Sequence, residues 1–257
     1  MFSFHPKKKF GQNFLKNKDL LKKISELRNF DNKLVLEIGP GKGALTEYLL
    51  KKKPKKLIAI EKDKELEPFL LKIQKKYSVN FEIIFQDALK YEYSKIKGEK
   101  IFLVANLPYH IATTLVIKWL KYIENFESII VMVQREVAER LSAKVSTKFY
   151  GRTSILVQLH SEVKKVFDVS PENFHPKPKV NSSVIELKPK CNLNFNYEKV
   201  DELLKICFAQ RRKKLKNNLN KISHSNLEKI IKSGIDLNLR PQDISIENYV
   251  MMSKLLI

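Results

Sequence analysis

The sequence is poor in several residue types, and each shortage excludes a class of protein. It holds only two cysteines, Cys191 and Cys207, without a CxxC spacing, and its five histidines are not clustered. We therefore expect no disulfide framework and no metal site. No run approaches the roughly 18 apolar residues of a transmembrane helix, and the basic N-terminus lacks the apolar stretch of a signal peptide. The sequence predicts a cytoplasmic protein that does not span a membrane.

Acidic residues are also few. Lys and Arg number 49 against 28 Asp and Glu, which gives a net charge of +21 over 257 residues. Such a surface attracts polyanions, with nucleic acid as the first expected partner and an acidic membrane surface as the second. A Lys-rich genome composition is the alternative explanation of this excess. Hydrophobic residues make up 43% of the chain, enough for one large α/β domain and a small appendage.

Short apolar runs alternate with helical patterns in the first two thirds of the chain. This alternation predicts a mostly parallel sheet with helices on both faces. The expected strands span 34–38, 57–61, 81–85, 101–106 and 129–134, and the expected helices span 44–51, 64–75 and 113–121. Thr113 or Thr114 is the expected N-cap of the last of these helices. Two further strands, 162–168 and 181–187, have no helix between them and are expected to pair as antiparallel neighbours at one edge.

The segment Lys188-Pro-Lys190 is the expected domain boundary. Residues 1–189 would form the sheet domain with a basic N-terminal arm. Residues 190–257 are polar, basic and helical in pattern, without a convincing strand, and are expected to form a small all-helical domain.

A glycine-rich loop, Glu37-Ile-Gly-Pro-Gly-Lys-Gly43, follows the first expected strand. Gly39 and Gly41 permit a tight turn and let a ligand approach the backbone closely. The helix that follows offers free N–H groups to an acceptor. Oxidoreductases that bind dinucleotides use a similar loop, so glycines alone do not decide the ligand. The spacing E-x-G-x-G-x-G, rather than G-x-G-x-x-G, is similar to the S-adenosylmethionine loop of class I methyltransferases.

Acidic residues end the next two expected strands. A carboxylate at Glu61, 22 residues past Gly39 (61 − 39), can accept both hydroxyls of a ribose, and Asp87 can accept the amino group of an adenine. The alternatives are a solvated strand end for Glu61 and a turn cap for Asp87. Ligands of open α/β sheets bind outside the carboxyl ends of the strands, so acidic residues at consecutive strand ends favour a cofactor site.

The motif Asn106-Leu-Pro-Tyr109 follows the fourth expected strand and predicts the catalytic site. The amino group of adenine is a poor nucleophile, because its lone pair is delocalised into the ring. The Asn106 side-chain carbonyl and the Leu107 backbone carbonyl can accept its protons and turn the lone pair towards a methyl donor. Pro108 would stiffen the turn, and Tyr109 would stack on the base. The alternative is an ordinary Pro-containing turn with a half-buried Tyr.

Two basic segments are expected to contact nucleic acid. In the loop Phe174-His-Pro-Lys-Pro-Lys-Val180, Phe174 can cover a flipped base, and Lys177 and Lys179 can reach phosphates. A Pro-rich hairpin with a core-anchoring Phe is the alternative. The second segment is the basic run at 210–221. If it is helical, its charges cover more than one helical face, which favours contact with RNA over a single solvated face. Its expected RNA contacts are Arg211, Arg212, Lys213, Lys214 and Lys216.

Taken together, these motifs resemble those of the KsgA/RsmA family of ribosomal RNA adenine dimethyltransferases. The resemblance runs from about Lys9 to the C-terminus and includes Phe10-Gly-Gln-Asn-Phe-Leu15, 134–140, Tyr150-Gly-Arg152 and Phe208-Ala-Gln-Arg-Arg212 in addition to the segments above. It implies a Rossmann-like class I methyltransferase sheet, a helical C-terminal domain and S-adenosylmethionine as methyl donor, with no metal. It also implies dimethylation of two adjacent adenosines near the 3′ end of small-subunit ribosomal RNA. The implied cofactor residues are Asn13, Leu15, Gly39, Glu61, Asp87 and Asn106.

Alternatives stay open at this point. The loop at 174–183 also resembles that of macrolide-resistance methylases, which modify large-subunit RNA, whereas Leu107 and the basic run at 210–218 favour the small-subunit group. A ribosome-assembly factor whose catalysis is dispensable is a further possibility. The expected partner is small-subunit RNA within a small ribosomal subunit or its precursor, with no membrane partner and a monomeric protein.

Overall fold

The computed structural model describes residues 4–77, 80–96, 98–191 and 194–256. Two compact units make up the chain: the first comprises residues 1–138 and 162–189, and the second comprises residues 139–161 and 190–257. The sequence placed residues 139–161 in the sheet domain. The structure groups them with the C-terminal helices instead.

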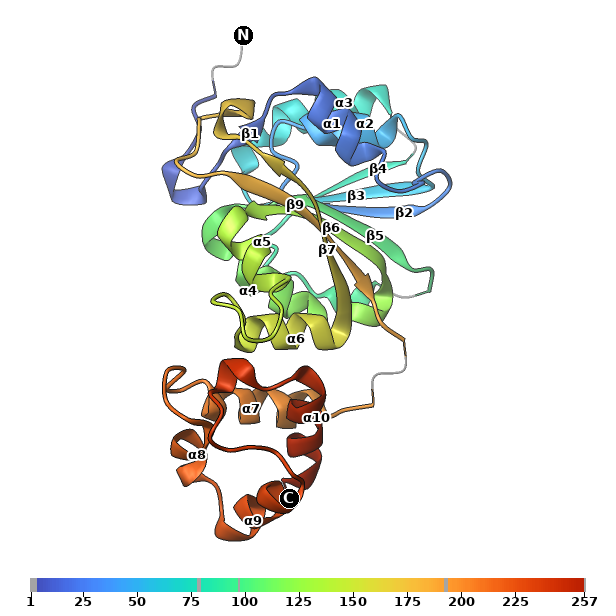
Figure 1. Cartoon of the computed structure of the whole chain (residues 1–257). Helices are drawn as coiled ribbons and strands as arrows, with labels where there is room; N and C mark the ends of the chain where they lie inside the picture. The colour runs from blue at the N-terminus through green and yellow to red at the C-terminus, as the bar shows by residue number, and fades with distance from the viewer. Residues whose placement is uncertain (1–3, 78–79, 97, 192–193, 257) are drawn as a thin grey trace. The chain divides into compact units, whose positions relative to one another are not determined.

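A seven-stranded sheet forms the first unit (Figure 1). Its strand order is β4-β3-β2-β5-β6-β9-β7, in which β2 to β6 are parallel and β9 runs antiparallel to β6. The expected parallel sheet, with the two late strands at one edge, is confirmed. The strands are β2 (Leu34–Ile38), β3 (Lys56–Glu61), β4 (Phe81–Phe85), β5 (Ile101–Asn106), β6 (Phe126–Gln134), β7 (Ser161–Val169) and β9 (Ser182–Pro189).

Helices cover both faces of this sheet (Figure 1). One face carries α1 (Lys18–Ser25), α2 (Ala44–Leu50) and α3 (Glu67–Lys76), and the other carries α4 (Tyr109–Leu120). The central strands are therefore buried on both sides, as the continuous apolar runs require. Short 3₁₀ helices span Lys8–Phe10, Lys64–Leu66, Tyr93–Lys95, Ile123–Asn125 and Pro171–Asn173.

Helix α4 begins earlier than the sequence suggested. Its N-cap is Pro108, with φ −58°, and neither Thr113 nor Thr114 caps it. Proline has a fixed φ near this value and no N–H to satisfy, which suits the start of a helix. The Asn106-Leu-Pro-Tyr109 motif therefore leads directly from strand β5 into the helix.

The N-terminal arm pairs with a distant part of the chain. Strand β1 (Phe14–Leu15) runs antiparallel to β8 (Phe174–His175), with Phe14 opposite His175 and Leu15 opposite Phe174. The sequence predicted neither strand. Because β8 lies in the loop before β9, this pairing ties the arm to the sheet's antiparallel edge.

The second unit consists of helices among its described residues. It contains α6 (Arg152–His160), α7 (Tyr197–Cys207), α8 (Leu215–Asn218), α9 (His224–Lys232) and α10 (Ile246–Leu255), with 3₁₀ helices at Leu219–Lys221 and Pro241–Asp243. Helix α5 (Arg135–Leu141) spans the junction of the two units. None of the described helices has both the length and the apolar character that a membrane crossing requires.

Specific polar contacts explain why residues 139–161 join this unit. The buried Tyr150 hydroxyl donates to the Ile244 carbonyl at 3.1 Å. The Arg152 guanidinium donates from Nε and Nη2 to the buried Asp201 carboxylate. Residues 150–152 are one of the segments that carry the family resemblance, and in the structure they anchor the start of α6 within the second unit.

Candidate active site

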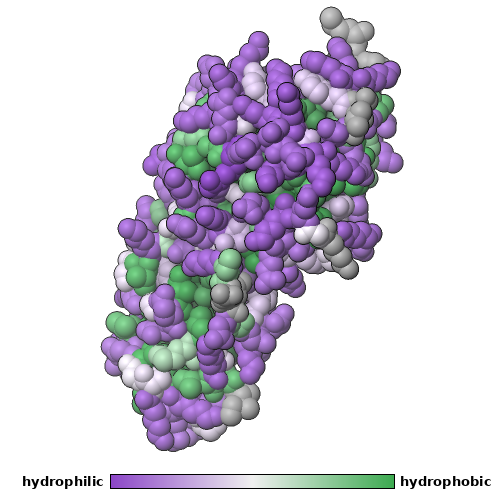
Figure 2. All heavy atoms as spheres, turned by 90° about the vertical axis from the view of Figure 1, so that its right-hand side faces the viewer, coloured by the Kyte–Doolittle hydropathy of each residue, from purple (hydrophilic) through white to green (hydrophobic). Residues whose placement is uncertain are grey.

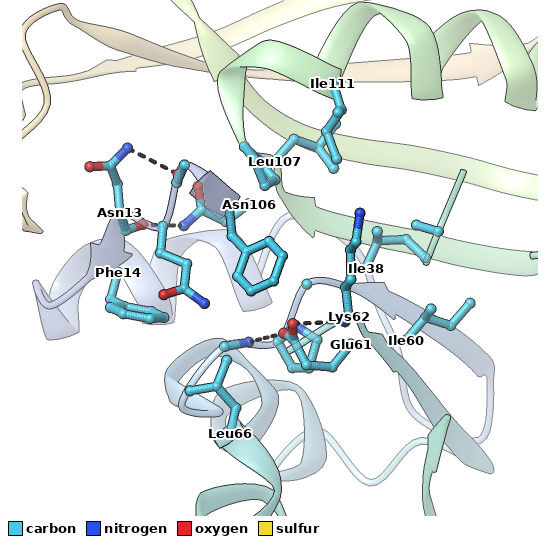
Figure 3. A pocket seen from close by; sticks show the side chains of 18 of the residues that line it. Asn13, Phe14, Ile38, Ile60, Glu61, Lys62, Leu66, Asn106, Leu107 and Ile111 are labelled. Atoms are coloured by element: carbon cyan, nitrogen blue, oxygen red, sulfur yellow. Dashed lines mark hydrogen bonds between the residues drawn. The ribbon is translucent and has the colours of Figure 1, made fainter. Parts of the chain in front are cut away.

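One pocket lies at the carboxyl ends of the parallel strands (Figure 3). Each of the predicted cofactor residues lines it: Asn13, Leu15, Gly39, Gly41, Glu61, Asp87 and Asn106. Leu107, Pro108 and Tyr109, which were predicted to be catalytic, line it as well. Residues far apart in sequence therefore meet at one edge of the sheet.

The glycine-rich loop forms the floor of this pocket. Gly39 and Gly41 have φ of +69° and +61°, the left-handed region that side chains disfavour. A Cβ on Gly41 would also lie 2.8 Å from the Phe14 ring, whereas a Cβ on Gly39 would meet nothing closer than the Asn106 carbonyl at 3.9 Å. The backbone conformation therefore favours glycine at both positions, and close packing of the arm requires it at Gly41.

Glu61 is held in place by the backbone around it. Its Oε2 accepts from Gly41 N at 3.1 Å, and its Oε1 accepts from Lys62 N and Asp63 N, each at 2.8 Å. Burial raises the pKa of this carboxyl, and the three N–H donors oppose that rise. Oε2 accepts only one of these bonds, so a lone pair of that oxygen remains for a hydroxyl of a ligand.

Glu37 is a buried acid at the same site to which the sequence analysis assigned no role. Burial raises its pKa to about 8. Its Oε2 has no hydrogen-bond partner among the described residues. The signal was present in the sequence, because Glu37 opens the glycine-rich motif. A buried acceptor without a partner on the pocket wall is what a ligand carrying N–H groups would satisfy.

Asp87 lies beside a lysine. Its Oδ2 accepts from Lys62 Nζ at 2.8 Å, and its Oδ1 accepts from Leu89 N at 2.9 Å. Burial opposes ionisation of Asp87, but the hydrogen bonds from Lys62 and Leu89 N and the charges of Lys62 and Lys90 together hold its pKa below the usual value. Lys118 Nζ donates to the Leu89 and Tyr91 carbonyls at 2.6 and 2.8 Å, which fixes the turn that follows Asp87.

Asn106 points into the pocket in a defined orientation (Figure 3). Its Nδ2 donates to the Asn13 backbone carbonyl at 3.1 Å. A carbonyl only accepts hydrogen bonds, so nitrogen must be the amide atom that faces Asn13. The amide oxygen is therefore left for another donor. Asn13 Nδ2 in turn donates to the Gly11 carbonyl at 3.3 Å.

The N-terminal arm is fastened at several points. Lys7 Nζ donates to Asp63 at 2.7 Å, and Gln12 Nε2 donates to the other Asp63 oxygen at 2.9 Å. The Lys42 ammonium lies 5.1 to 5.6 Å from the ring centroids of Phe4, Phe14 and Phe69. These cation–π and ionic contacts hold residues 4–15 along the pocket. From sequence, this arm was recognisable only through the family resemblance.

Phe174 does not have the exposed position expected of a base-stacking residue. Its ring is 2% exposed and belongs to the hydrophobic core. Pairing of β8 with β1 draws it inward, so the alternative of a core-anchoring Phe describes it better. Lys177 and Lys179 in the same loop are exposed, and Lys177 pairs with Glu172 at 2.7 Å.

The basic C-terminal segment also differs from its prediction. Residues 209–214 are not helical: 209–212 form a turn, and a helix begins only at Leu215. Arg211 donates to the backbone carbonyls of Thr147 and Lys148, so its guanidinium stabilises the second unit and is not a free RNA contact. The remaining basic residues are exposed: Arg212, Lys213, Lys214 and Lys216. Hydrophilic residues likewise cover most of the molecular face in Figure 2.

The pocket fits S-adenosylmethionine. Its apolar walls include Ile38, Leu66 and Ile111, which suit the flat face of an adenine. Its carboxylates, Glu61 and Asp87, suit hydroxyl and amino donors and a positively charged sulfonium. The described residues contain no group of three or more His, Cys, Asp or Glu side chains that is arranged to hold a metal ion.

Comparisons with known proteins point to one family. A family model described as ribosomal RNA adenine dimethylase matches residues 3–257. The chain is 43% identical over 251 residues to the ribosomal RNA small subunit methyltransferase A of Ehrlichia ruminantium, covering 96% of both proteins. It is 41% identical to the protein of the same name from Pelagibacter ubique, covering 96% of this chain and 95% of that relative.

Solved structures agree with this assignment. A dimethyladenosine transferase from Plasmodium falciparum superposes with a TM-score of 0.83 at 28% identity, covering 93% of this chain and 95% of that one. The 23S rRNA methyltransferase ErmE superposes with a TM-score of 0.70 at 24% identity, covering 95% and 99%, and shows the fold alone. The chain therefore belongs to the ribosomal RNA adenine dimethylase family, and it is an S-adenosylmethionine-dependent adenine dimethyltransferase with a Rossmann-like sheet, as the sequence predicted.

Proposed function

We propose that this protein dimethylates N6 of two adjacent adenosines near the 3′ end of small-subunit ribosomal RNA, within a small subunit or its precursor in the cytoplasm. The observation that carries the proposal is the anchored Asn106 amide on the pocket lining, whose nitrogen donates to the Asn13 carbonyl and whose oxygen is left for another donor. The names of the relatives, small subunit methyltransferase A, support the choice of polymer.

Asn106 and Leu107 would activate the target base. S-adenosylmethionine supplies a methyl group on a sulfonium, which is a good leaving group. The Asn106 and Leu107 carbonyls would accept the two amino protons of adenine and turn the nitrogen lone pair towards that methyl group. Pro108 fixes this turn, and Tyr109 would stack on the base. Acceptors held in advance need little reorganisation during the reaction, so they lower its barrier.

Glu61, Asp87 and the N-terminal arm would hold the cofactor. Glu61 would accept a ribose hydroxyl at Oε2 and Asp87 the adenine amino group, while Asn13 and Leu15 would close the pocket from the arm. The Asn13 carbonyl also anchors Asn106. Asn13 would thereby both close the pocket over the cofactor and position Asn106.

The exposed lysines and arginines would bind RNA phosphates. Lys177 and Lys179 lie in the loop next to β8, and the others lie in the second unit at Arg212, Lys213, Lys214 and Lys216. The first unit would supply catalysis and the second unit most of the RNA contact. Binding through phosphates releases counterions, so affinity would fall steeply with salt. We propose that the protein acts as a monomer.

Replacing Asn106 tests the proposed catalytic role. We expect Asn106→Ala to lower methyl transfer to unmethylated small subunits about 100-fold or more, because it removes a preorganised acceptor, while RNA binding is retained. Asn125→Ala is a matched control, since Asn125 Nδ2 also donates to a backbone carbonyl, that of Tyr93, but does not line the pocket. Unchanged turnover in Asn106→Ala would refute the assigned role.

A further inference from the structure

Tyr109 is tied to a residue on another strand. Its phenol oxygen lies 2.7 Å from the Ser182 hydroxyl, within hydrogen-bond distance. Ser182 is fully buried, whereas Tyr109 is partly buried on the pocket wall. Ser182 itself does not line the pocket, so it touches the site through Tyr109.

The antiparallel direction of β9 brings Ser182 to this place. Ser182 begins β9 and pairs with Gln134 at the end of β6. Since β9 runs antiparallel to β6, its first residue lies at the edge of the sheet where the carboxyl ends of the parallel strands meet. The backbone around it is fixed, because Arg135 N donates to Asn181 O at 3.0 Å. The serine hydroxyl is thus a rigid reference point beside the catalytic turn.

Fixing the phenol oxygen restricts the whole ring. A tyrosine side chain rotates about two torsions, and a bond at its far end limits both. Tyr109 is the first residue of α4 and follows Pro108 directly, so its Cα is fixed as well. Both ends of the side chain are therefore held before any base arrives, which reduces the ordering cost of stacking.

We propose that Ser182 is a positioning residue that sets the plane of the Tyr109 ring for the target adenine. The inference rests on the proposed function, in which Tyr109 stacks on the base. It makes the phenol hydroxyl of Tyr109 an orienting group and leaves the stacking surface to the ring carbons. The start of β9 would thereby influence how the target base is oriented without contacting the base.

A double-mutant cycle tests the proposal. Tyr109→Phe removes the phenol hydroxyl but keeps the ring, Ser182→Ala removes its partner, and a third variant combines both. We expect each single variant to lower kcat/KM for unmethylated small subunits about 5-fold, the usual worth of one neutral hydrogen bond. The double variant should lose no more than the worse single variant, because both act through one bond. The Kd for S-adenosylmethionine should be unchanged in all three.

Ser183→Ala is the matched control. Ser183 is the next residue, is equally buried and donates to Asp168 rather than to Tyr109. Its kcat/KM should equal that of the wild type. Wild-type turnover in Ser182→Ala, or additive losses in the double variant, would overturn the inference. Tyr109→Ala tests the stacking role separately from the role of Ser182. Full activity in Tyr109→Ala would refute the stacking role itself. Loss of activity in Tyr109→Ala together with full activity in Ser182→Ala would refute only the role of Ser182.

Discussion

Glu37 offers a direct test of how the pocket is built. Its carboxyl is 2% exposed, one of its oxygens has no partner among the described residues, and burial raises its pKa to about 8. In the unfolded chain its pKa returns to about 4.5. Folding therefore favours the protonated form, and this group's contribution to stability is fully present below pH 4.5 and is lost as the pH rises towards 8.

The size of the effect follows from the two pKa values. Between pH 4.5 and 8 the folded protein binds one more proton at Glu37 than the unfolded chain, so stability should fall by about 1.4 kcal/mol per pH unit from this group. The total to pH 8 is roughly 5 kcal/mol on the same relation. Glu37→Gln stays neutral at every pH and should lack this slope.

Denaturant unfolding of the cofactor-free protein between pH 5.5 and 9 measures the difference. We expect the free energy of unfolding of Glu37→Gln to exceed that of the wild type increasingly as the pH rises. Glu124→Gln, a change at an exposed glutamate, should run parallel to the wild type. A constant difference between Glu37→Gln and the wild type across this range would refute the burial of a protonated Glu37.

Three further changes test other parts of the structure. Glu61→Ala should weaken S-adenosylmethionine binding about 100-fold, since hydrogen bonds to a carboxylate are strong; calorimetric titration giving wild-type affinity would remove Glu61 from the site. Lys118→Met should raise the cofactor Kd several-fold, because the Leu89 carbonyl loses its donor and the turn after Asp87 loosens; an exposed neighbour, Lys121→Met, should leave the same titration unchanged. Asp201→Ala should lower the free energy of unfolding by about 2 kcal/mol, since it leaves a partly exposed guanidinium without its buried partner; a denaturation midpoint equal to that of the wild type would contradict this.

Local patterns predicted most of the sheet and the polar strand ends. The central strands β2, β3, β5 and β6 consist mainly of buried apolar residues, so their runs stand out in the sequence. Glu61, Asp87 and Asn106 follow such runs directly, and a parallel sheet must bring these ends to one edge. The pocket follows from topology once the strands are placed.

Contacts between distant segments decided what the sequence analysis missed. The arm gains its position from bonds such as Asn106 to Asn13 and from the pairing of Phe14 with His175, which no local pattern contains. The same pairing buries Phe174, a ring that its loop context had suggested was free. Arg211 carries a formal charge in a basic run, yet two backbone carbonyls of the second unit bind it. Charge counts do not reveal such internal partners.

The helix boundary and the domain boundary show the same limit. Thr113 and Thr114 are good N-cap residues in isolation, but Pro108 already starts α4 where the strand ends. Residues 139–161 follow the sheet in sequence, yet the Arg152–Asp201 pair and the Tyr150 hydroxyl bind them to the second unit. The first boundary is set by a neighbouring proline and the second by contacts between distant segments.

The most direct test of the proposed activity maps the methylated product. Purified protein and labelled S-adenosylmethionine would be offered unmethylated small subunits, large subunits and bare DNA, followed by digestion and mapping of the label. We predict N6,N6-dimethyladenosine at two adjacent positions near the 3′ end of small-subunit RNA and no label elsewhere. Label in large-subunit RNA, or no label despite measurable cofactor binding, would contradict the proposed function.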